Sequence, residues 1–224
     1  MWEHSLHWTG RMCSMEYIYC FNMDNQSMLW EKYGHKKNLK IWAERSAQTI
    51  KFLKEAQNVQ AAATCIMRNV FALVQDGEFV TAAGLADSIV AAFRRVDMEA
   101  EILHIVDIEN NILAIYSEAG RISDAIRMGF LLNRYIRKLE EDGYSNDMAL
   151  NNITRFQFNK YIVTQQIKLN MNLAIAYNRN GEKNQGEKHL QYALTIANHH
   201  QEAVRSETEL LSHLIHLYRY GLPD

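Results

Sequence analysis

The chain has 224 residues, of which 24 are Lys or Arg and 26 are Asp or Glu, so its formal net charge is −2. With 48% hydrophobic residues it has the composition of a globular protein that can bury a core. The balanced charge excludes the large basic face that nucleic-acid-binding proteins use. The single proline is Pro223, so no proline interrupts a helix before the last two residues. Composition therefore predicts an all-α protein.

Cysteine usage and hydropathy indicate the compartment. Cys13, Cys20 and Cys65 are odd in number and lack metal-site spacing. No secretory signal is visible in residues 1–10, and no stretch approaches the ~20 apolar residues of a membrane span. We therefore expect a cytoplasmic chain with no membrane partner.

The first 35 residues differ from the rest. They hold Trp2, Trp8 and Trp30 together with five methionines, without sustained helical periodicity. We interpret residues 1–35 as an atypical N-terminal cap or a stump, and residues 36–224 as one helical repeat domain.

Apolar periodicity predicts eight helices after that segment. Their expected ranges are 36–56, 59–75, 79–95, 99–118, 122–140, 149–179, 183–199 and 202–220. In the polar loop from Glu140 to Asn146, Asn146 or Asp147 is the expected helix cap. The run from Met148 to Arg179 holds no helix breaker and predicts one long helix, or two joined without a turn signal.

Three segments repeat one pattern, in which a helix is followed by a glycine and, five residues later, by Ala or Gly. They are residues 67–82, 110–125 and 171–186, with Gly77, Gly120 and Gly181 followed by Ala82, Ala125 and Gly186. A glycine can take the left-handed conformation that ends a helix, and a small residue lets the next helix pack closely. The pattern predicts a right-handed α-solenoid of degenerate tetratricopeptide-like (TPR) hairpins. The aromatic residues Phe71, Tyr116 and Tyr177 are expected to pack between the hairpins.

Side-chain amides gather on the helices that would line the concave face of such a solenoid. An asparagine amide offers a donor and an acceptor to a peptide backbone, although surface asparagines are also common without any function. The candidate peptide-binding residues are Asn110, Asn172, Asn69, Gln75 and Asn111.

The stretch from Ile108 to Gly120 (IENNILAIYSEAG) resembles the peptide-sensing domain of the PlcR-like receptors in the RRNPP quorum-sensing family. The resemblance covers residues 59–220, and Leu169 to Leu194 corresponds to the family's next sensing repeat. It implies a cytoplasmic receptor, often dimeric, whose asparagines clamp the backbone of a short peptide. Asn110 and Asn172 are the positions implied here. Nothing in residues 1–56 resembles the family's DNA-binding helix-turn-helix, so direct nucleic-acid binding is not expected.

Signatures of catalysis are missing from the sequence, which has no G-x-S-x-G, phosphate-binding glycine loop or C-x-x-C. His213 and His216 have metal-ligand spacing but are interpreted as semi-buried polar residues. We therefore expect no enzyme, no metal and no cofactor. The leading hypothesis is a sensor for a short peptide that shifts its conformation or dimer state. The alternatives are a TPR scaffold for another protein and the sensor fragment of a larger transcriptional regulator.

Overall fold

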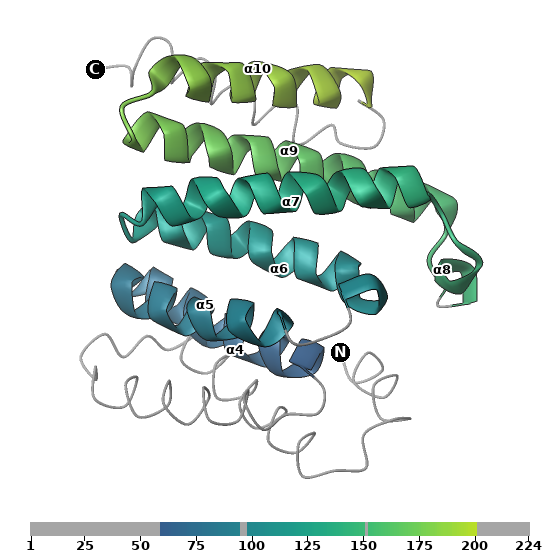
Figure 1. Ribbon diagram of the computed structural model, residues 1–224, viewed down its shortest axis with the longest axis horizontal. Coiled ribbons are helices and arrows are strands. Elements are labelled where there is room, and N and C mark those ends of the chain that lie inside the picture. The colour runs from purple at the N-terminus through teal and green to yellow at the C-terminus, as the bar shows by residue number, and fades with distance from the viewer. Residues whose placement is uncertain (1–58, 95–97, 151, 201–224) are drawn as a thin grey trace. The chain divides into compact units, whose positions relative to one another are not determined.

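Uninterrupted apolar periodicity produces helices throughout the part of the chain that the structure describes. The computed structural model describes residues 59–94, 98–150 and 152–200, and within these ranges it contains helices and no strand (Figure 1). The helices are α4 (Val59–Gln75), α5 (Phe79–Phe93), α6 (Met98–Glu118), α7 (Ile122–Asp142), α8 (Asn146–Leu150), α9 (Arg155–Arg179) and α10 (Lys183–His199). The all-α prediction is thereby confirmed. The expected helices at 36–56 and 202–220, and the proposed cap at 1–35, lie outside the described residues.

The chain divides into two compact units, Met1–Glu101 and Ile102–Asp224. In the first unit α4 packs against α5, and in the second α9 packs against both α7 and α10. A solenoid would span both units, so the right-handed solenoid stays a prediction. The expected domain boundary between residues 35 and 36 also stays a prediction.

The three glycine turns are built alike. Gly77, Gly120 and Gly181 have φ angles of +80°, +75° and +82°, so each takes the left-handed conformation that was predicted. In each turn the residue after the glycine donates its N–H to a carbonyl five residues earlier, as in Arg121 N to Tyr116 O at 2.8 Å. This is the Schellman arrangement, which satisfies carbonyls left over at a helix end. The repeated sequence pattern therefore encodes a repeated hairpin turn.

Small residues lie on the buried sides of the helices that follow the glycine turns. Ala82 and Ala125 are fully buried and Gly186 is buried, as their position after each glycine predicted. A closer approach occurs at Gly129, which lies on the buried side of α7. A Cβ atom added there would lie 2.4 Å from Leu173 Cδ2 on α9. The glycine at position 129 therefore allows α7 and α9 to pack together in the second unit.

The region from 146 to 179 is two helices, not one. Asn152 takes a φ of +61° between α8 and α9, and α9 starts after Thr154. Thr154 Oγ1 accepts from Gln157 N at 3.1 Å, while Gln157 Oε1 accepts from Thr154 N at 2.8 Å. This capping box starts a new helix although no glycine or proline interrupts the run from Met148 to Arg179.

Two further expectations need correction. Asn146 and Asp147 are the first two residues of α8 and so do not hold the cap position, and the residue before the helix is Ser145, whose Oγ accepts from Met148 N at 3.3 Å. Phe71 on α4 is 40% exposed and is therefore not the buried packing residue that was expected. Tyr116 is buried as expected, and Tyr177 stacks on the His189 ring at 5.3 Å between centroids.

Among the described residues, no helix is both long enough and apolar enough to cross a membrane.

Candidate functional site

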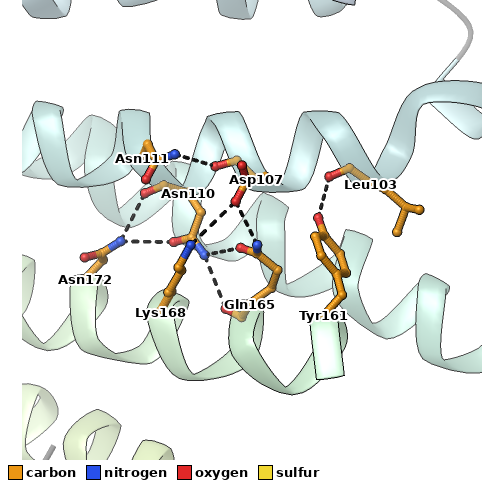
Figure 2. A network of polar contacts seen from close by, with 8 residues as sticks. All are labelled: Leu103, Asp107, Asn110, Asn111, Tyr161, Gln165, Lys168 and Asn172. Carbon is orange, nitrogen blue, oxygen red and sulfur yellow. Dashed lines mark hydrogen bonds and ion pairs between the residues drawn. The ribbon is translucent and has the colours of Figure 1, made fainter. Parts of the chain in front are cut away.

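A row of polar contacts joins α6 to α9 where the two helices run side by side in the second unit (Figure 2). At one end Tyr161 of α9 donates its hydroxyl to the carbonyl of Leu103 in α6. Near the C-terminal ends of both helices, Arg179 donates to the carbonyl of Ser117 at 2.7 Å and pairs with Glu118 Oε1 at 2.6 Å. The helices are thus held together by side chains near both ends of their contact.

Three amides form the middle of the row. Asn172 Nδ2 on α9 donates to both the backbone carbonyl and Oδ1 of Asn110 on α6, each at 3.0 Å. Asn110 Nδ2 in turn donates to Gln165 Oε1 at 3.0 Å and to the Gln165 carbonyl at 3.2 Å. Each amide therefore bonds to the opposite helix and not to its own.

The three amides lead to a carboxylate. Gln165 Nε2 donates to Asp107 Oδ1 at 2.9 Å, and Lys168 Nζ lies 3.6 Å from the same oxygen. One turn further along α6, Asn111 Nδ2 donates to the backbone carbonyl of Asp107 at 3.0 Å. Asp107 thus connects the amides to a partly solvated charge pair.

Some side chains of the row are buried and others are exposed. Asn110 and Gln165 are only 1% and 2% exposed, whereas the side chains of Asp107 and Lys168 are 49% and 46% exposed. Ile175, which follows Asn172 by three residues and Lys168 by seven, is 41% exposed and lies on the same side of α9. We name the exposed set Asp107, Asn111, Lys168, Asn172 and Ile175 the α6–α9 face.

Burial and charge also shift ionisation equilibria around this face. Burial, and secondarily the negative charge of Asp107, raises the pKa of the Tyr161 phenol, which therefore stays protonated and able to donate. On the far side of α9, burial lowers the pKa of His189, whose Nδ1 lies 2.8 Å from Asn170 Oδ1. A neutral His189 with the proton on Nδ1 fits that contact, since Asn170 Oδ1 can only accept.

The predicted site residues fall into two groups. Asn110, Asn111 and Asn172 come together at the contact between α6 and α9. Asn69 is buried in α4 of the first unit, and Gln75 is the last residue of α4, with its side chain outside the described part. The amide of Asn110 bonds within the fold, while Asn111 and Asn172 are partly exposed. A peptide-binding role for any of the five stays a prediction.

Sequence reasoning missed Gln165, Asp107 and Lys168. A signal for them was present, because Gln165 and Lys168 precede Asn172 by seven and four residues, and Asp107 precedes Asn111 by four. Residues at these spacings share one side of a helix. The pattern of polar residues on two neighbouring helices could therefore have indicated the row.

No group of three metal-ligating side chains comes together within the described ranges, and His213 and His216 lie outside them. Comparison with models of known protein families, with curated proteins and with solved structures found no match for this chain.

Proposed function

We propose that the chain is a cytoplasmic sensor that binds a short, extended peptide on the α6–α9 face and acts as a homodimer. The observation that carries the proposal is the exposed edge of the polar row, where two partly exposed amides, a charge pair and an exposed isoleucine lie along neighbouring helices. The TPR-like turns and the resemblance to RRNPP receptors support the same assignment. The five-residue set includes two of the asparagines that sequence reasoning selected.

The chemistry of the face suits a peptide. A backbone presents alternating N–H and C=O groups, which side-chain amides such as those of Asn111 and Asn172 can meet. Asp107 and Lys168 offer one charge of each sign within 3.6 Å of each other, so they can receive charged side chains or termini. Ile175 offers an apolar contact beside them. Together these groups fit a single peptide a few residues long.

The position of the face gives binding a way to act. The face is shared by α6 and α9, which are the first helices of two successive hairpins. A peptide that contacts both helices stabilises one spacing of the two hairpins over others. A ligand shifts a conformational equilibrium only through such a preference for one state.

A thermal-shift titration with a pool of random-sequence decapeptides tests the proposal. We expect a saturable rise in the unfolding midpoint, because a ligand at 100 times its dissociation constant adds about 2.7 kcal/mol of stability. A cooperatively unfolding chain whose midpoint no decapeptide moves would contradict a short-peptide sensor. Binding only to long or folded partners would instead favour the scaffold alternative.

A further inference from the structure

The amide contacts between α6 and α9 all run in one direction. Asn172 donates to Asn110, Asn110 donates to Gln165, and Gln165 donates to Asp107 (Figure 2). A primary amide can be turned either way, since its oxygen and nitrogen are nearly equal in size. A series of hydrogen-bonded amides therefore has a fixed donor-to-acceptor direction only if a neighbouring group that can only donate or only accept imposes it.

Three acceptor-only groups impose the direction here. The Asp107 carboxylate can only accept, so Gln165 must turn its NH2 group towards it and its oxygen towards Asn110. The backbone carbonyls of Gln165 and Asn110 also can only accept, and they receive second bonds from Asn110 and Asn172. Turning Asn110 or Asn172 over would place oxygen against oxygen at two contacts, and turning Gln165 over would place oxygen against oxygen at Asp107 and nitrogen against nitrogen at Asn110.

The consequence appears at Asn172, at the opposite end of this hydrogen-bonded series from Asp107. Asn172 uses its nitrogen twice on Asn110, and Figure 2 shows its amide oxygen directed away from that residue. Asn172 is partly exposed, and among the described residues its oxygen is not one of the buried side-chain atoms that lack a partner, which leaves it open to a ligand on the α6–α9 face. Hydrogen bonds in a chain polarise one another, which strengthens the acceptor at the free end.

We infer that Asn110, Gln165 and Asp107 are positioning residues that fix Asn172 as an acceptor, so that the α6–α9 face selects a ligand group that donates an N–H at this point. The inference rests on the proposed function and adds a specificity to it. A backbone N–H of a peptide meets this requirement, whereas a tertiary amide at the same position does not.

The test is an N-methyl scan of one decapeptide recovered from the random-sequence pool. Each backbone N–H is replaced in turn by N–CH3, and affinity is measured for the full chain and for Asn172→Ala. We expect N-methylation at one position to lower the affinity for the unaltered chain about tenfold and to change the affinity for Asn172→Ala little. Both changes remove the same hydrogen bond, from a peptide N–H to the Asn172 oxygen. The matched control is Asn133→Ala, an exposed asparagine of α7 that should leave the whole scan unchanged.

The positioning residues are tested by repeating the scan on Asn110→Ala and on Gln165→Leu. Gln165→Leu keeps most of the side-chain volume and therefore serves as the test if Asn110→Ala does not fold. In these variants the loss of affinity at the N-methyl position that depends on Asn172 should become smaller, while the losses at the other N-methyl positions persist. Equal scans for the unaltered chain and Asn172→Ala would overturn the inference but leave peptide binding intact. Coupling that neither Asn110→Ala nor Gln165→Leu reduces would overturn the positioning role. If no decapeptide binds, the proposed function fails and the inference fails with it.

Discussion

Gly129→Ala is expected to destabilise the protein by about 1–3 kcal/mol, the usual cost of forcing an extra methyl into a packed contact. The added Cβ would lie 2.4 Å from Leu173 Cδ2 and 2.9 Å from Leu173 Cγ. Leu173 is itself only 6% exposed, so it has little room to move. Chemical denaturation of the full chain measures the effect as a lower transition midpoint.

Two variants make this prediction specific. Gly84 lies in α5, and a Cβ atom added to it would meet nothing within 4 Å, so Gly84→Ala should stabilise by about 0.5–1 kcal/mol through helix propensity alone. In a Leu173→Ala background, Gly129→Ala should cost much less, because the obstructing atoms are gone. Equal effects of Gly129→Ala in both backgrounds would show that α7 and α9 do not meet at this glycine.

Asn110→Leu is expected to destabilise by about 2 kcal/mol, since it leaves buried polar atoms without their partners. The substitution removes the donor to Gln165 Oε1, in a residue only 2% exposed, and one acceptor for Asn172. Asn111→Leu is the matched control. Asn111 bonds only to the carbonyl of Asp107 in its own helix and is partly exposed, so its replacement should change stability by less than about 0.5 kcal/mol.

The double variant Asn110→Leu with Gln165→Leu distinguishes a hydrogen-bond effect from a packing effect. Replacing both partners by apolar groups leaves neither of the two amides facing a lost partner, so the pair should cost less than the sum of the two single variants. Strict additivity in denaturation experiments would contradict the contact between these two amides.

Local features of the fold were predictable from the sequence because they depend on local chemistry. The range 59–75 for α4 and the left-handed glycines at 77, 120 and 181 follow from periodicity and from the freedom of glycine. The break before α9 is also encoded locally, by the capping box of Thr154 and Gln157, and not by a glycine or proline.

Features that depend on neighbouring helices were not predictable in the same way. Phe71 is 40% exposed although its position relative to Gly77 suggested packing. Asn110 and Asn111 are adjacent in sequence, but α9 covers the first and leaves the second partly exposed. Periodicity gives the side of a helix on which a residue lies, whereas its burial depends on which helix covers that side.

The most direct test of peptide binding on the α6–α9 face is to place a charge in its apolar part. The measurement is the affinity of the decapeptide recovered from the random-sequence pool for Ile175→Asp and for Tyr192→Asp. These side chains are 41% and 56% exposed, and Tyr192 lies on α10, outside the face. We expect Ile175→Asp to lose about tenfold or more, because a bound peptide would desolvate the new carboxylate, and Tyr192→Asp to bind as before. Unchanged binding by Ile175→Asp, or equal losses in both variants, would contradict binding at the α6–α9 face.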